Sequence, residues 1–265
     1  MKSSWKAPDE GRAWTAAGQR VAFLATLVLI WALAARYGPW HSALFPGPAA
    51  VAVSFARMAR DGTLLSAVAR SLLRLLQGYG LSVLVGVPLG IATARVPLLR
   101  RTIKPVVMGL QSLPSVCWMP LAILWFGLSE AAILFVVVMG SLLSIAISTE
   151  DGVSSIQPQL LQVSGTLGIR GARFYGGVLV PAALPGIVTG LKLGWSFAWR
   201  ALMAGELLFV SGGLGQLLTT ARELLDVAQV MAVMAAIVAI GVVMDRVLFQ
   251  AVETRVRRRW GLEAT

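Results

Sequence analysis

The sequence predicts an all-α integral membrane protein with about six transmembrane helices. Of its 265 residues, 57% are hydrophobic and only 13% are charged, against about 25% charged in an average soluble domain. The apolar residues also form long runs that are bounded by Arg and Lys. The net charge of +11 therefore indicates topology signals between membrane segments and not a surface for nucleic acid.

Six apolar runs are each long enough to cross the hydrocarbon layer. Crossing takes about 20 residues, or fewer where flanking Arg or Lys side chains reach the headgroups. The runs are residues 21–35, 75–94, 105–128, 131–149, 184–209 and 227–244. Between the first two, a Phe-Pro-Gly-Pro turn at 45–48 precedes a stretch, 49–60, whose pattern is typical of a short helix at the membrane surface.

The basic residues of short loops favour the cytoplasm and so give the orientation. With the amino terminus inside, the inner segments hold Lys2, Lys6, Arg12, Arg20, Arg95, Arg100, Arg101, Lys104, Arg170, Arg173, Arg255, Arg257, Arg258 and Arg259. The outer segments hold chiefly Arg36, Arg57, Arg60 and Arg222. We therefore expect a cytoplasmic segment 1–20 without a cleavable signal peptide, a transmembrane domain 21–250 and a basic cytoplasmic tail 251–265.

The fifth run carries a polar helical face. At about 100° per residue, one side collects charged, aromatic and polar residues, and the opposite side collects glycines and an alanine. The polar side holds Lys192, Trp195, Ser196, Trp199, Arg200, Met203 and Glu206. A charge that faced lipid would cost at least ~2.5 kcal/mol, so these residues are expected to line a wet path that attracts anions. The alternative is that Lys192 reaches the inner surface, Arg200 pairs with Glu206 and the tryptophans only pack.

The third run has the composition of a bent helix that could act as a gate. Pro114 and Pro120 remove backbone donors, which a membrane tolerates where a cavity or a neighbouring helix satisfies the freed carbonyls. Polar and aromatic residues accompany them, namely Gln111, Ser112, Trp118 and Trp125. Ser141 and Ser144 of the fourth run could line the same space. The alternatives are kinked packing for the third run and bonds to the serines' own helix backbone for the fourth.

The inner loop, residues 150–180, contains a family signature. From Gln162 to Pro181 it reads QVSGTLGIRGARFYGGVLVP. Its spacing resembles the cytoplasmic signature of the permease subunits of type I ABC importers, with Gln162, Val163 and Ser164 in the opening places, Gly168 at the glycine and Pro181 at the end. Gln162 stands where that family has an acidic residue, so a hydrogen bond would replace an ion pair there.

The resemblance implies that this loop forms a coupling helix that docks on a separate ATP-hydrolysing subunit. The residues it assigns to this contact are Gln162, Val163, Ser164, Gly165, Thr166, Leu167, Gly168, Arg170 and Pro181. Gly168 would allow a sharp turn, and Pro181 would begin the fifth span. Arg170 and Arg173 would either help the docking or hold the loop at the inner surface.

Further segments are similar to the branch of these permeases associated with nitrate, sulfonate, taurine and bicarbonate. They include LPSVCWMPLAILWFG and SFAWRALMAGELL, and the similarity runs over about residues 45–246. Near relatives take thiamine-type cofactor precursors. The resemblance implies a non-catalytic permease in the bacterial inner membrane, present as two copies with two ATP-binding subunits and an external substrate-binding protein.

Cofactors and catalytic residues are not expected on this chain. It lacks the glycine-rich phosphate loop of ATP-binding proteins, so ATP and Mg would bind the partner subunit. With Cys117 and His41 as its single cysteine and histidine, it can form neither an internal disulfide nor a metal site of clustered Cys or His. The competing hypotheses are a self-sufficient ion-coupled carrier or channel and, third, a membrane enzyme.

Overall fold

The computed structural model describes residues 10–208, 211–250 and 254–255 and contains only helices within them. The expected cytoplasmic segment 1–20 and tail 251–265 therefore lie partly outside the described residues. The helices are α1 (Glu10–Tyr37), α2 (Pro48–Arg60), α3 (Thr63–Arg95), α4 (Pro97–Gln111), η1 (Ser115–Trp118), α5 (Met119–Phe126), α6 (Glu130–Ser154), α7 (Pro158–Thr166), α8 (Ala172–Phe174), η2 (Tyr175–Leu179), α9 (Val180–Glu206), α10 (Leu214–Glu223), α11 (Val227–Met244) and η3 (Asp245–Gln250).

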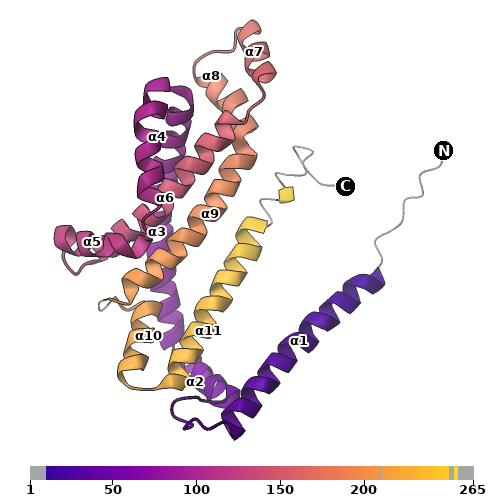
Figure 1. The fold of residues 1–265 in the computed structure, drawn as a ribbon, viewed down its shortest axis with the longest axis vertical. Helices are drawn as coiled ribbons and strands as arrows, with labels where there is room; N and C mark the ends of the chain where they lie inside the picture. The colour runs from indigo at the N-terminus through magenta and orange to yellow at the C-terminus, as the bar shows by residue number, and fades with distance from the viewer. Residues whose placement is uncertain (1–9, 209–210, 251–253, 256–265) are drawn as a thin grey trace.

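Among the residues that the structure describes, four helical stretches are long and apolar enough to cross a membrane. They are Thr63–Arg95, Glu130–Ser154, Ala172–Glu206 and Val227–Val247. The apolar part of α1, Val21–Tyr37, is shorter. Figure 1 shows α3, α6 and α9 side by side, with α7 at one end of the molecule and α2 and α10 at the other. We call these the α7 end and the α10 end.

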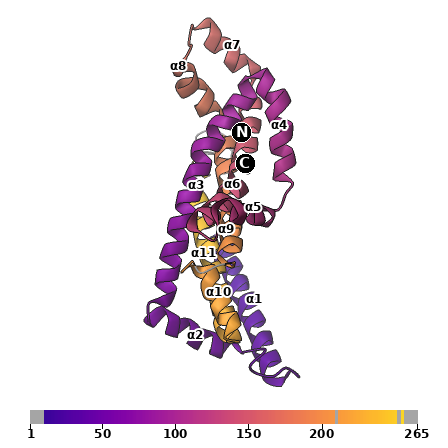
Figure 2. The same ribbon diagram turned by 90° about the vertical axis from the view of Figure 1, so that its left-hand side faces the viewer.

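The third apolar run does not form a single helix over 105–128. The structure has α4 from Pro97 to Gln111, and then η1 and α5, bent away from α4 by 103°. Pro114 explains the break, because its ring disfavours a helical conformation of Leu113 and it has no N–H to donate to an upstream carbonyl. Figure 2 shows α5 turning aside at mid-height, so the run enters from the α7 end and stops halfway.

The α6 helix is the centre of the fold because small residues let α3 and α9 approach it closely. A Cβ added to Gly186 of α9 would lie 2.5 Å from the Cα of Gly152 in α6, and one added to Gly90 of α3 would collide with the carbonyl of Ala146. The glycine face expected for the fifth run therefore packs on α6, which confirms this prediction.

Outside this centre, α1 stands apart from the other helices (Figure 1). It meets α2, and Trp31 Nε1 donates to the Pro46 carbonyl at 3.1 Å.

The fifth span begins earlier than residue 184, since α8, η2 and α9 form one apolar helical stretch from Ala172. Pro181 lies in the first turn of α9, as expected, but the apolar stretch continues upstream of it through the π-helical turn η2. Such turns accommodate local breaks in the ladder of backbone hydrogen bonds.

Candidate functional site

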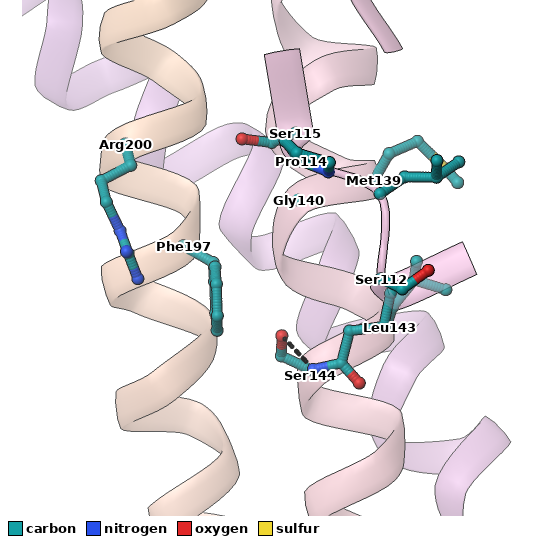
Figure 3. Close-up of a pocket in the computed structure, with 11 residues that line it drawn as sticks. Ser112, Pro114, Ser115, Met139, Gly140, Leu143, Ser144, Phe197 and Arg200 are labelled. Carbon is teal, nitrogen blue, oxygen red and sulfur yellow. Dashed lines mark hydrogen bonds between the residues drawn. The ribbon is translucent and has the colours of Figure 1, made fainter. Parts of the chain in front are cut away.

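A cavity of about 260 Å³, lined by both polar and apolar side chains, lies at the break between α4 and η1. Its walls come from the end of α4, the break itself, the middle of α6 and the outer half of α9. Figure 3 shows Phe197 and Arg200 on α9 and, on the opposite side, Pro114 and Ser115. The lining residues are Gln111, Ser112, Leu113, Pro114, Ser115, Met139, Gly140, Leu143, Ser144, Phe197 and Arg200.

The end of α4 supplies the polar side of this pocket. Gln111 Nε2 donates to Ser144 Oγ of α6 at 3.2 Å, the bond drawn as a dashed line in Figure 3. Ser112 Oγ donates to the Gly109 carbonyl at 2.7 Å and so satisfies one acceptor in the last turn of α4. Because Pro114 ends the helix here, both side chains lie at an open break and not along a packed helical face.

Arg200 supplies the positive charge of the pocket. Its side chain is exposed, Nε donates to the Ser196 carbonyl at 3.1 Å, and the guanidinium lies 4.6 Å from the centre of the Phe197 ring. Within residues 10–208, 211–250 and 254–255, no carboxylate pairs with it. The remaining guanidinium N–H groups can therefore bind an anion.

One alternative had expected Glu206 to pair with Arg200. In the structure the two side chains do not pair. The two residues are six positions apart, a spacing that does not bring side chains together on a helix. Instead, the fully buried Glu206 carboxylate accepts from Arg74 Nη1 at 2.8 Å, Ser71 Oγ at 2.7 Å and the Gly215 N–H at 3.0 Å. This cluster lies toward the α10 end, away from the pocket.

Arg74 extends the cluster to a fourth helix. It pairs with Glu130, the first residue of α6, where Nη2 donates to Oε1 at 2.6 Å, and it also donates to the Ser211 carbonyl. We call the buried Ser71, Arg74 and Glu206, together with the exposed Glu130 at their edge, the buried charge cluster. It connects α3, α6, α9 and α10.

The other expected path residues lie outside the pocket. Lys192 Nζ is 3.8 Å from Asp245 Oδ1, and Trp195 is buried edge-on against Tyr79 with their ring centres 5.2 Å apart. Trp199 and Met203 pack against residues of α2, α3, α10 and α11.

The remaining expected residues also serve packing or local bonding. The Ser196 carbonyl accepts from Arg200. Trp118 and Trp125 make edge contacts with Phe135, with ring centres 6.3 and 5.6 Å apart. Ser141 Oγ is buried, 2.8 Å from the Val137 carbonyl of its own helix and 2.7 Å from Ser82 Oγ.

Of the twelve expected path residues, the structure thus brings Gln111, Ser112 and Arg200 into one pocket. It adds Ser115, Met139, Gly140 and Phe197, which sequence reasoning missed. The signal that could have found Ser115 was its place directly after Pro114, because a break in a helix exposes the residues beside it. Sequence reasoning missed Arg74 because this residue marks the start of the second apolar run. In the structure α3 begins 11 residues before it, so Arg74 lies inside the helix.

The signature residues form a short helix that projects at the α7 end (Figure 1). On α7, Gln162, Val163, Gly165 and Thr166 are exposed, as are Leu167, Gly168 and Arg170 beyond it, while Ser164 is buried and donates to the Leu161 carbonyl at 2.8 Å. Gly168 has φ +67°. The Ile169 N–H donates to Ser164 and the Gly168 N–H to Gly165, the pattern of a Schellman motif. The expected sharp turn at Gly168 is confirmed.

Comparisons with known proteins agree with this architecture. Residues 86–258 match the family described as binding-protein-dependent transport system inner membrane component. The chain is 30% identical over 227 residues to the taurine transport system permease protein TauC of Escherichia coli, which covers 84% of this chain and 82% of TauC. It is 30% identical over 203 residues to the putative aliphatic sulfonates transport permease protein SsuC of the same organism, covering 76% of each.

A solved structure of the MetNI methionine ABC transporter, titled as an inward facing conformation, has the same fold. The TM-score is 0.63 at 20% identity, over 76% of this chain and 97% of that one.

Proposed function

Because this chain belongs to the binding-protein-dependent transport system inner membrane components, the permease subunits of ABC importers, we propose that the pocket at the break after α4 holds the transported solute. The solute carries a small anionic group, as taurine, other sulfonates, nitrate and bicarbonate do. Family membership also decides between an ATP-driven permease and the self-sufficient carrier that the sequence left open, in favour of the permease.

The single observation that carries the substrate class is the unpaired Arg200 at the pocket. A cation within the membrane is costly unless protein groups, water or a ligand stabilise it. Here the stabilisation comes from one carbonyl and one aromatic face, which leaves guanidinium N–H groups for a sulfonate or carboxylate oxygen. The Ser115 hydroxyl and the second N–H of the Gln111 amide can donate to its remaining oxygens. The same charge disfavours a positively charged solute of the thiamine type.

The projecting α7 helix supports contact with a separate ATP-binding subunit. Val163 and Leu167 are 54% and 70% exposed, an apolar surface that a groove on a partner would cover. We propose that the transporter contains two copies of this chain, two subunits that bind ATP and Mg, and an external binding protein that delivers the solute.

The proposed placement is the bacterial inner membrane, with the α7 end in the cytoplasm. The α1 helix starts and α11 finishes toward this end (Figure 1), so both termini would be cytoplasmic. Arg95, Arg100 and Arg101 lie at the same end, in agreement with the positive-inside rule.

Arg200→Ala in the assembled transporter tests this proposal. Loss of a hydrogen bond to a charged group costs about 1.5–3 kcal/mol, which is about 10- to 100-fold in apparent affinity. We expect uptake of labelled taurine and of labelled nitrate into proteoliposomes to require that much more solute, with basal ATP hydrolysis unchanged. Arg200→Lys should keep part of the affinity, and Arg101→Ala, which removes an exposed Arg of α4, should have no effect. Normal affinity of Arg200→Ala for every anion tested would refute the proposed site.

A further inference from the structure

The α4 helix is attached to the fold far more loosely than α6. Val107 is its only buried residue, whereas α6 is held between α3 and α9 by close backbone approaches at Gly90 and Gly186. Between its two ends, α4 faces α6 across a small cavity of about 10 Å³, which Val107 lines with Ala146 and Ile147. Apolar packing therefore does little to fix the position of α4.

Polar contacts at two places attach α4 to α6 instead. Near the α7 end, Lys104 Nζ donates to the carboxylate of Glu150 and lies 3.8 Å from Asp151 Oδ1. At the pocket, Gln111 Nε2 donates to Ser144 Oγ at 3.2 Å. Lys104, Val107 and Gln111 recur at helical spacing on one face of α4. The two contacts are seven residues, or about 10.5 Å, apart along the helix.

These two contacts differ greatly in strength. The Glu150 side chain is 2% exposed, and besides Lys104 it accepts from Ser154 Oγ at 3.0 Å and has Arg100 Nε at 3.8 Å. Separating such a pair leaves a buried charge alone, which costs about 3–5 kcal/mol. A single hydrogen bond between neutral groups contributes only about 0.5–1.5 kcal/mol, and a polar ligand can replace it.

We propose that Lys104 and Glu150 are positioning residues that form a fixed pivot between α4 and α6, while the Gln111–Ser144 bond opens during transport. Opening turns the pocket end of α4 away from α6 and frees the Gln111 amide and the Ser144 hydroxyl for the oxygens of the solute. The pivot keeps the α7 end of α4 in place, so the movement is concentrated at the break before Pro114. This inference rests on the proposed role of the pocket in the transport path.

Reversible cross-linking of each contact in turn shows which contact stays closed as a pivot and which one opens during transport. In a Cys117→Ser background, one variant carries Gln111→Cys with Ser144→Cys, and the other carries Lys104→Cys with Glu150→Cys. A short bifunctional methanethiosulfonate bridges each pair, because a direct disulfide needs Cβ atoms about 3.5–4.5 Å apart. The second variant removes both charges together, so neither is left buried without its partner.

We expect opposite effects on taurine uptake by the assembled transporter. Cross-linking residues 111 and 144 should lower uptake at least tenfold, and reductant should restore it. The variant at residues 104 and 150 should be impaired before cross-linking, and the cross-link should raise its uptake to within twofold of the background protein. The inference would be overturned if the cross-link between residues 104 and 150 stopped uptake. It would also be overturned if the cross-link between residues 111 and 144 left uptake unchanged.

Comparison with Arg200→Ala separates this inference from the proposed function. If Arg200→Ala weakens uptake but the cross-link between residues 111 and 144 does not, the pocket binds the solute and the proposed pivoting of α4 is wrong. If neither changes uptake, both proposals fail. A second measurement is the amount of solute taken up per ATP hydrolysed. Lys104→Arg should keep this ratio, whereas Lys104→Met should still hydrolyse ATP but take up little solute. The exposed Arg101→Met on the same helix is the matched control.

Discussion

Replacing Glu206 by Ala should destabilise the whole helical assembly. The carboxylate is fully buried and accepts hydrogen bonds from Arg74, Ser71 and the Gly215 backbone. Its removal leaves the buried Arg74 with Glu130 and the Ser211 carbonyl, while the first turn of α10 loses its acceptor. Breaking a buried pair in this way costs about 3–5 kcal/mol.

The matched variant Glu206→Gln keeps the size of the side chain and one acceptor oxygen. It loses the charge opposite Arg74, which is worth about 1.5–3 kcal/mol as a hydrogen bond to a charged group. Since 1 kcal/mol corresponds to about 2–4 °C in a domain of about this length, the melting temperature should fall by roughly 6–20 °C for Ala and about half as much for Gln. Glu223→Ala removes an exposed acid at the other end of α10 and should leave it unchanged.

Thermal unfolding of the purified protein in detergent provides the measurement, since the nine tryptophans give a fluorescence signal. The order of melting temperatures should be Glu223→Ala, then Glu206→Gln, then Glu206→Ala. A Glu206→Ala protein that melts within 2 °C of the Glu223→Ala control would refute the assignment of the buried charge cluster as the main polar support of the α10 end.

Three further predictions, two of them with a control variant, test other parts of the structure. Gly213→Ala should cost about 1–3 kcal/mol of stability, because the added Cβ would collide with the Glu206 carboxylate; Gly80→Ala in α3, with open space around it, should be neutral or slightly stabilising in the same melting assay. Gly168→Ala should lower binding-protein-stimulated ATP hydrolysis, because φ +67° strains any residue with a Cβ by about 1 kcal/mol; unchanged stimulation would contradict the role of that turn. Val163→Cys, exposed on α7, should cross-link to the ATP-binding subunit within the assembled transporter, whereas the buried Ser164→Cys should react slowly.

The architecture was largely predictable because it follows from apolar run length and basic flanks. The run 227–244 coincides with α11, and the run 131–149 lies within α6, which starts one residue earlier and ends five residues later. The turn at Gly168 was predictable as well, because a left-handed residue at a helix end is a local property of the chain. The break at Pro114 was only half predictable: proline shows where a helix bends, but the 103° angle depends on the helices packed around it.

The site was less predictable because a helical wheel shows the face of a residue but not its neighbour. Trp195 and Arg200 lie on the same side of the wheel, yet Trp195 faces Tyr79 in the core and Arg200 borders the pocket. Glu206 has its partner 132 residues away on α3, a contact between distant segments that no local pattern reveals. Pocket residues such as Met139 and Gly140 belong to α6 and have no polar signature of their own.

The continuous stretch from Ala172 to Glu206 has a mechanical consequence for the transporter. Its 35 residues amount to about 52 Å at 1.5 Å per residue, whereas a bilayer with its headgroups is about 40–45 Å thick. Held upright, such a rod overhangs the lipid by roughly one to two turns. Force applied by a subunit in the cytosol would therefore act on a lever arm that stands clear of the headgroups and belongs to the same helical stretch as the pocket wall at Arg200.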